Sequence, residues 1–348
     1  MALALSPSRR HVYVANALGK TLATFELDPV AGTLSRIGLT ATEAQPWSLQ
    51  MHPSGRFLYV KSADTAQVQV FSLDAISGLP TSSGPANRLG RDMVLDPAGR
   101  SGQMLAPAGG LFSFDIDSSS GGIVPIAGQP SYAPDSYFQG KLVMAPSGGY
   151  LLAASFDPQT GGQGIVLWRR DPASGLMLGL PERPQAVGFD DTRTVMSLAL
   201  SPTGRYMVFV REDLRTYPER FGNPTIHFAT IDPGTGRVSY SAALGQQIVL
   251  ERLNRFVSDW SLTFDPSEKL VYVSRGDGHV DTYAIEPQDG SIRPSDGINV
   301  HPEHVDYSPY IVQTVVFELR PETPAQARAR LRKPVGSARP LKAPARAP

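Results

Sequence analysis

Short stretches in which apolar and polar residues alternate run along most of the chain. Such alternation predicts β-strands with one buried face. Turns rich in Pro, Asp, Ser and Gly separate the stretches, as in HPSGR at 52–56 and LDPVAG at 27–32. Proline presets φ and glycine tolerates a positive φ, so these turns suit tight connections between antiparallel strands. The pattern therefore predicts an all-β protein.

This strand and turn pattern repeats six times along the chain. Each copy has a strand, a turn around a framework proline, a second strand, and then another strand–turn–strand half. The framework prolines are Pro7, Pro53, Pro97, Pro146, Pro202 and Pro266. One four-stranded antiparallel sheet cannot bury both of its faces, whereas sheets stacked around an axis can. We therefore expect a β-propeller with one four-stranded blade per repeat.

The end of the repeat region leaves the number of blades open. SPYIVQTVVFELR at 308–320 resembles the first strand of a repeat and predicts a closing strand. The N-terminus, however, already supplies an opening strand within ALALSP at 2–7. Two alternatives follow: a six-bladed ring with an extra strand, or a seven-bladed ring whose last blade needs a segment upstream of residue 1.

Residues 321–348 differ in composition from the predicted propeller at 1–320. They contain five Arg and two Lys against one Glu, a net charge of +6, and they lack apolar periodicity. Such a segment cannot bury enough apolar surface to offset its ordering entropy, so we expect a basic disordered tail. The whole chain has a formal net charge of zero, and we expect no nucleic-acid partner for the propeller.

Targeting signals and cysteines bear on the compartment. No stretch approaches the roughly 18 consecutive apolar residues that span a bilayer, so we expect no membrane partner. The start, MALALSPSRR, lacks the order of charge and apolar run that a signal peptide has. We therefore expect a soluble cytoplasmic monomer, or a periplasmic one if a segment precedes residue 1. The chain has no cysteine, which excludes disulfides.

The residues of the first two repeats resemble those of a known family. SPSRRHVYVAN at 6–16, FELDPVAGTLSRIG at 25–38 and HPSGRFLYV at 52–60 are similar to segments of the seven-bladed β-propeller lactonases. That family includes bacterial 6-phosphogluconolactonases, and YVTN-type propellers share its framework. The resemblance spans residues 1 to about 320. It implies a propeller with an active-site depression of His, Arg and Glu at one end of the central channel.

The resemblance carries only part of that active site onto this chain. The family's histidine corresponds to Gly140, and its Arg-His pair in the next blade corresponds to Met196 and Ser197. Its glutamate corresponds to Glu212, and its second arginine corresponds to Arg275, one residue out of register. Lactone hydrolysis needs a general base and a group that stabilises the oxyanion. Glu212 and Arg275 are therefore the candidate catalytic residues of a possible lactone hydrolase.

A second group of candidates lies at the start of each predicted innermost strand, five or six residues before the framework proline. These residues are Trp47, Arg91, Asp92, Lys141 and Trp260, with Tyr310 in the matching place of the closing strand. Aromatic walls with a few charges suit a small polar ligand such as a sugar lactone or an organic anion. Two structural alternatives stay open. The tryptophans could wedge between blades, and Arg91 could form an ordinary ion pair with Asp92.

Motifs for metals and cofactors are weak in this chain. GKT at 19–21 lacks the first glycine of a phosphate-binding loop and precedes a predicted strand. His301, Glu303 and His304 have the chemistry of metal ligands but no helix to align them. We therefore expect no metal and no cofactor. The favoured function is a binding propeller for a small polar ligand or a protein partner at the channel mouth. The alternative is a metal-independent lactone hydrolase.

Overall fold

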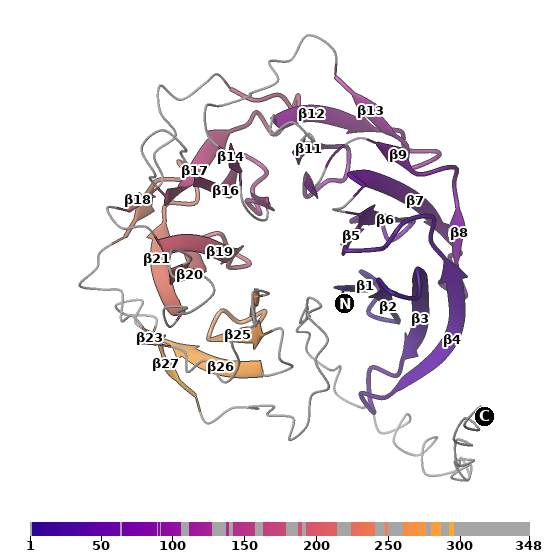
Figure 1. Ribbon diagram of the computed structural model, residues 1–348, viewed down its shortest axis with the longest axis horizontal. Coiled ribbons are helices and arrows are strands. Elements are labelled where there is room, and N and C mark those ends of the chain that lie inside the picture. The colour runs from indigo at the N-terminus through magenta and orange to yellow at the C-terminus, as the bar shows by residue number, and fades with distance from the viewer. Residues whose placement is uncertain are drawn as a thin grey trace, which may run out of the picture.

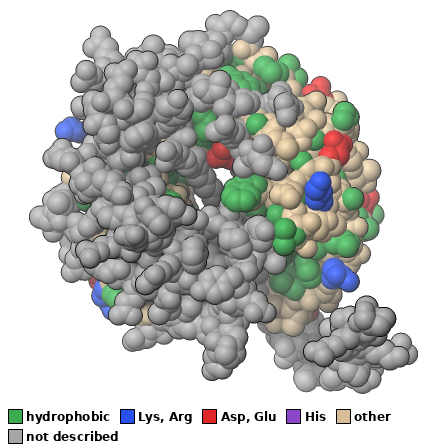
Figure 2. Space-filling model, in the orientation of Figure 1, with side chains coloured by type: hydrophobic (Ala, Val, Ile, Leu, Met, Phe, Trp, Pro, Cys, Tyr) green, Lys and Arg blue, Asp and Glu red, His purple; other side chains and the backbone are tan. Residues whose placement is uncertain are grey.

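The computed structural model describes residues 2–62, 65–88, 90, 92–105, 111–126, 137–138, 142–156, 163–178, 187–189, 193–213, 224–240, 248–249, 260–275, 280–286 and 292–295. They form six antiparallel sheets that are arranged as blades around a central opening (Figure 1, Figure 2). The predicted β-propeller is confirmed. The predicted closing strand at 308–320 and the predicted tail at 321–348 lie outside the described residues.

The first three blades each run along the chain from the innermost to the outermost strand. Blade 1 consists of β1 (Ala2–Leu5), β2 (His11–Asn16), β3 (Thr21–Leu27) and β4 (Leu34–Ala41). Blade 2 consists of β5 (Ser48–Met51), β6 (Phe57–Ser62), β7 (Gln67–Leu73) and β8 (Pro80–Ser82), and β9 (Asn87–Arg88) also pairs with β7. Blade 3 consists of β10 (Asp92–Leu95), β11 (Ser101–Leu105), β12 (Leu111–Ile116) and β13 (Ile123–Pro125).

The other three described blades follow the same order. In blade 4, β14 (Tyr137–Phe138) and β15 (Val143–Met144) both pair with β16 (Tyr150–Phe156), followed by β17 (Gln163–Arg169) and β18 (Val187–Phe189). Blade 5 consists of β19 (Arg193–Leu200), β20 (Tyr206–Asp213), β21 (Thr225–Ile231) and β22 (Val238–Ser239), and β23 (Ile248–Val249) pairs with β21. Blade 6 consists of β24 (Trp260–Phe264), β25 (Leu270–Arg275), β26 (Val280–Ile285) and β27 (Ile292–Pro294).

The hydrophobic core is divided among the seams between neighbouring blades. Successive side chains of a strand point to opposite faces, so each second strand serves two seams. In β6, Leu58 packs in the cluster shared with blade 1, and Tyr59 packs in the cluster shared with blade 3. In β20, Phe209 packs toward blade 4 and Val208 packs toward blade 6. Strand alternation thus lets each of these blades bury apolar side chains against both of its neighbours.

Besides these apolar clusters, tyrosine hydroxyls and turn glycines form contacts between neighbouring blades. The Tyr13 hydroxyl donates to the Gly78 carbonyl of blade 2 at 2.8 Å. The Tyr59 hydroxyl donates to the Gly121 carbonyl of blade 3 at 2.9 Å. Gly121 has a φ of 73°, and a Cβ built on it would lie 2.6 Å from the ring of Phe57. The glycine therefore allows both the left-handed turn and the close approach of the next blade.

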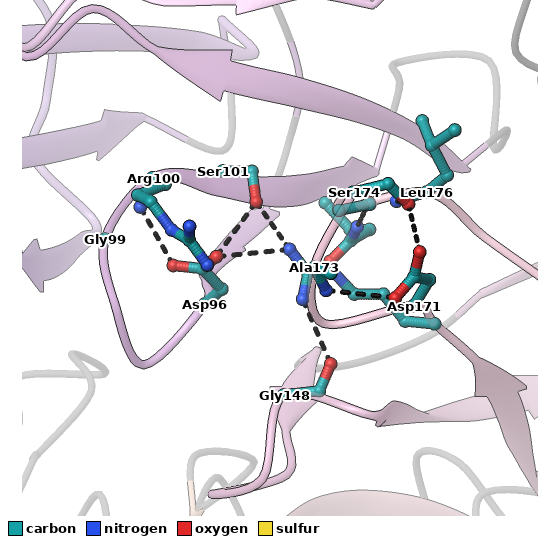
Figure 3. Close-up of polar contacts among 12 residues, drawn as sticks. Asp96, Gly99, Arg100, Ser101, Gly148, Asp171, Ala173, Ser174 and Leu176 are labelled. Atoms are coloured by element: carbon teal, nitrogen blue, oxygen red, sulfur yellow. Dashed lines mark hydrogen bonds and ion pairs between the residues drawn. The ribbon is translucent and has the colours of Figure 1, made fainter.

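The seam between blades 3 and 4 contains a buried arginine, Arg170. The matching position, directly before the acidic residue of the outer turn, holds an aliphatic residue in the other described blades: Leu27, Leu73, Ile116, Ile231 and Ile285. The fully buried Arg170 guanidinium donates to the Gly148 carbonyl at 3.0 Å and to the Asp96 carboxylate at 3.3 Å. It also donates to the Ser101 hydroxyl. Figure 3 shows Asp96, Ser101 and Gly148 around these contacts.

Candidate functional site

Strands of blades 1 to 3, together with Leu142 of blade 4, line a half-open cavity of about 210 Å³. Strands β1, β5 and β10 supply most of its described wall. The polar lining residues are Ser48, Gln50, Lys61 and Asp92, and the apolar ones are Leu3, Ala4, Leu5, Leu49, Met51, Met93 and Leu142. Figure 2 shows the central opening of the ring with hydrophobic and acidic side chains on the described part of its rim. This cavity is the candidate functional site.

A buried ion pair forms the charged part of this wall. The Lys61 ammonium, on β6 of blade 2, donates to the Asp92 carboxylate at the start of β10 in blade 3. It also donates to the backbone carbonyl of Met93, with an N···O distance of 3.3 Å. The side chains of Lys61 and Asp92 are only 4% and 16% exposed, so solvent screens their attraction weakly.

Asp92 has further partners that hold its carboxylate in place. Its Oδ1 accepts the backbone N–H of Met93 at 2.9 Å. Its Oδ2 accepts the backbone N–H of Leu142, in blade 4, at 2.9 Å. Hydrogen bonds to an ionised carboxylate are among the stronger ones in proteins. One side chain therefore links blades 2, 3 and 4 at the wall of the cavity.

The repeat itself determines where Lys61 lies. Ser48, five residues before the framework proline, pairs with Lys61 across β5 and β6, so both side chains lie on the same face of the blade. The matching pairs in four other blades are Ala2 with Ala15, Asp92 with Leu105, Ser197 with Val210, and Ser261 with Ser274. Within these five described pairs, charged side chains occur only in blades 2 and 3. They are the two that form the ion pair.

The structure separates the two tryptophans that the sequence singled out. Trp47 is 41% exposed, and its backbone N–H donates to the Lys61 carbonyl at 2.7 Å. Trp260 is 7% exposed and packs in the hydrophobic cluster between blades 5 and 6, where its indole nitrogen has no hydrogen-bond partner among the described residues. Met196 packs against the same cluster. Trp260 therefore packs between two blades, which is one of the two alternatives that the sequence left open for it.

The other predicted site residues are described only in part. The backbone of Glu212 lies in β20, paired with Thr194, and that of Arg275 lies in β25, paired with Trp260. Their side chains lie outside the described residues, and so do Arg91, Lys141 and Tyr310 in full. The convergence of these residues on one pocket therefore stays a prediction.

The distance of Asp92 from the framework proline places it at the channel, but that distance does not point to Lys61 as its partner. Lys61 belongs to FLYVKS at 57–62, a strand whose six residues are all buried. Lysine is almost never fully buried without a partner, so a lysine in such a strand is a usable signal for an ion pair. The identity of the partner was not accessible from the sequence, because 31 positions separate the two residues.

The described residues contain neither a metal-binding cluster nor a membrane-spanning helix. No group of three or more His, Cys, Asp or Glu side chains in this part of the chain is placed to hold a metal ion. His301, Glu303 and His304 lie outside it. No helix in the described ranges is long and apolar enough to cross a membrane.

Comparison with known proteins bears on the first blades most directly. Residues 1–95 match the family model of the seven-bladed β-propeller lactonases. The match covers blades 1 and 2 and strand β10 of blade 3. The resemblance inferred from the repeats is thereby confirmed. No curated protein matches the chain.

Solved structures share the fold over most of the chain. A protein of Bacteroides uniformis proposed to be a 6-phosphogluconolactonase has a TM-score of 0.64 and 14% identity, over 86% of this chain and 84% of that chain. The periplasmic gluconolactonase of Pseudomonas aeruginosa has a TM-score of 0.59 and 17% identity, with the same two coverages. The hydrazine synthase of Kuenenia stuttgartiensis has a TM-score of 0.54 and 17% identity, over 81% and 76%. These identities show the fold alone, and one fold hosts many chemistries.

Proposed function

We propose that this lactonase-like propeller is a binding scaffold that takes a small polar ligand into the cavity between blades 1 to 4. The observation that carries the proposal is the Lys61–Asp92 pair on the wall of that cavity. Small-ligand sites combine a largely apolar surface with a few fixed polar groups. The described wall has this composition, because leucine and methionine side chains surround Ser48, Gln50 and the ion pair.

Binding is favoured over catalysis because the described groups are poorly suited to hydrolysis. A general base needs a free lone pair directed at water, whereas three of the roughly four lone-pair sites of the Asp92 carboxylate already accept hydrogen bonds, from Lys61, Met93 and Leu142. The resemblance places Gly140 and Met196 where the lactonases have His and Arg. Met196 packs against an apolar cluster, so it adds no charge to a developing oxyanion.

A cavity-filling substitution tests this proposal. We expect Ser48→Leu to abolish binding of sugar lactones, measured by saturation-transfer NMR on the purified protein. Ser35→Leu, on the exposed outer strand β4, is the matched control and should bind as the wild type does. Both variants and the wild type should show no lactone turnover above the uncatalysed rate. Equal binding by the wild type and Ser48→Leu would place the ligand elsewhere.

A lactone hydrolase is the second candidate. Its support is positional: Glu212 and Arg275 are carried by β20 and β25, the second strands of neighbouring blades, near the C-terminal end of each. Glu212 would activate water, and Arg275 would stabilise the oxyanion or hold a carboxylate. A panel of sugar and muconate lactones tests this candidate. A hydrolase should show turnover in the wild type, lose it in Glu212→Gln and retain it in the exposed control Glu286→Gln. That result would make hydrolysis, and not binding, the function.

A further inference from the structure

We infer that the cavity selects uncharged, hydroxyl-rich ligands over their phosphorylated forms. Lys61 is the side chain that donates to the ligand, and Asp92 sets the charge selectivity. The inference rests on the proposed binding function of the cavity and adds the chemical class of its ligand. Three properties of the described wall carry it: a spare donor, a balanced charge and a mixture of polar and apolar groups.

The spare donor belongs to the Lys61 ammonium. An ammonium has three N–H groups. Two of them are used, by the Asp92 carboxylate and by the Met93 carbonyl. The side chain lines the cavity and is 96% removed from solvent, since it is only 4% exposed. The third N–H has no acceptor in the described part of the chain and is left for an oxygen atom of a ligand, in a place where water screens the interaction weakly.

The charge of the described wall is balanced. Lys61 and Asp92 are the two charged residues among its described lining residues, and they are paired with each other. A buried charge is stable only when it is paired and hydrogen-bonded. A phosphate group would bring about −2 charges next to Asp92, and the described lining residues include no unpaired cation to receive them, while Arg91 and Lys141 lie outside the described residues. A hydroxyl or a carbonyl oxygen brings no such penalty.

The remaining wall suits a small ring that carries hydroxyl groups. Among the described residues, nothing bonds to the Ser48 hydroxyl, and the Gln50 amide donates only to the Met51 carbonyl, at 3.3 Å. Ser48 and Gln50 can therefore both donate to and accept from a ligand. The cavity of about 210 Å³ equals roughly seven waters at about 30 Å³ each, which is room for one ring.

Calorimetric titration of the full chain with two matched probes tests the inference. The neutral probe is 1,5-anhydroglucitol, and the charged probe is its 6-phosphate. We expect the wild type to bind the neutral probe at least tenfold more tightly. Asp92→Asn leaves Lys61 as an unpaired cation and keeps an acceptor for the Leu142 N–H. This variant should bind the phosphorylated probe at least tenfold more tightly than the wild type does.

A second pair of variants tests Lys61 and guards against unfolding. We expect Lys61→Met to weaken binding of the neutral probe about tenfold. Since it leaves Asp92 unpaired, the double variant Lys61→Met/Asp92→Asn is measured as well. The double variant removes both charges and should bind neither probe tightly while keeping the circular dichroism of the wild type. The control variants Lys20→Met and Asp115→Asn, both at exposed positions, should bind both probes as the wild type does.

The possible results separate this inference from the proposed function. Tighter binding of the phosphorylated probe by the wild type would overturn the charge selectivity and leave the cavity as a binding site. Unchanged relative affinities in Asp92→Asn would overturn the role of Asp92. Unchanged affinity of the double variant for the neutral probe would overturn the role of Lys61. Absence of binding by both probes would overturn the proposed function together with this inference.

Discussion

Replacement of Arg170 by leucine gives the seam between blades 3 and 4 the kind of residue that the other described repeats have at this position. The repeat pattern alone suggests that this change is harmless. The structure predicts the opposite, because Arg170 neutralises Asp96 inside the seam. Arg170→Leu would leave that carboxylate, which is 3% exposed, without its cation.

The expected loss follows from the burial of both partners. Removal of one member of a buried ion pair destabilises a protein by about 3–5 kcal/mol. The leucine side chain offsets part of this loss by its own burial, and no described residue accepts a hydrogen bond from the Arg170 Nε, so that bond is not lost. We therefore expect the free energy of unfolding to fall by about 3 kcal/mol, near the lower end of that range.

Equilibrium unfolding in urea, followed by circular dichroism, measures this loss. Arg169→Leu is the matched control, since Arg169 is the exposed neighbour of Arg170 and its loss should change stability by less than about 0.5 kcal/mol. The variant Asp96→Ser supplies the second half of a double-mutant cycle. Serine keeps an acceptor for the Arg100 N–H that now donates to Asp96, because Ser6, at the matching position of blade 1, accepts the Arg10 N–H in the same way.

The double variant Arg170→Leu/Asp96→Ser removes the stranded charge. We expect it to be about 2 kcal/mol more stable than the sum of the two single losses predicts, within the range of coupling for residues in contact. Two results would refute the reasoning: a loss below about 1 kcal/mol in Arg170→Leu, or strict additivity of the two substitutions. Either would mean that the pair contributes little to holding blades 3 and 4 together.

The remaining predictions concern the seams between blades 1, 2 and 3. Tyr13→Phe leaves the Gly78 carbonyl without its donor and should lower the free energy of unfolding by about 1–2 kcal/mol in urea; a loss below 0.3 kcal/mol would contradict this. Burial also raises the pKa of Tyr13 to about 12. The neutral Tyr13 hydroxyl therefore stabilises the fold below pH 10, and this stabilisation should be lost as pH rises through 12. Absorbance at 295 nm follows the ionisation of the hydroxyl, and urea unfolding at each pH follows the stability. Burial, and then the charge of Arg10, lower the pKa of His11. Neutral His11 therefore contributes to the free energy of unfolding above pH 6.5, and this contribution is lost as pH falls through the lowered pKa. His11→Phe should flatten the dependence of the free energy of unfolding on pH, and an unchanged dependence would contradict the prediction. Gly121→Ala strains a φ of 73° and places a methyl group against a phenyl ring, so we expect thermal unfolding at a clearly lower temperature. The same change at the exposed Gly234, which lacks a positive φ and where a Cβ would lie 3.4 Å from its nearest neighbour, is the milder control.

Much of the candidate site lay beyond sequence reasoning because its contacts cross blades. Asp92 was found from its distance to the framework proline, a local rule that each repeat obeys. Lys61 was not found as its partner, although a charged residue in a fully buried strand is unusual. The same holds for Arg170, whose position differs visibly from the other repeats but whose partner Asp96 lies 74 residues away.

The amino-acid sequence by itself determined the fold of the described region. Strand alternation and turn chemistry act over a few residues, and their repetition specifies stacked four-stranded sheets. Only the tertiary structure decided which charged residues meet. Ring stacking brings β6 of blade 2 against β10 of blade 3, so Lys61 reaches Asp92 and closes the wall of a cavity. The local pattern predicts a blade, but the packing of one blade against the next creates the site. That packing brings together side chains from segments far apart in the sequence, so a local pattern does not reveal which of them meet.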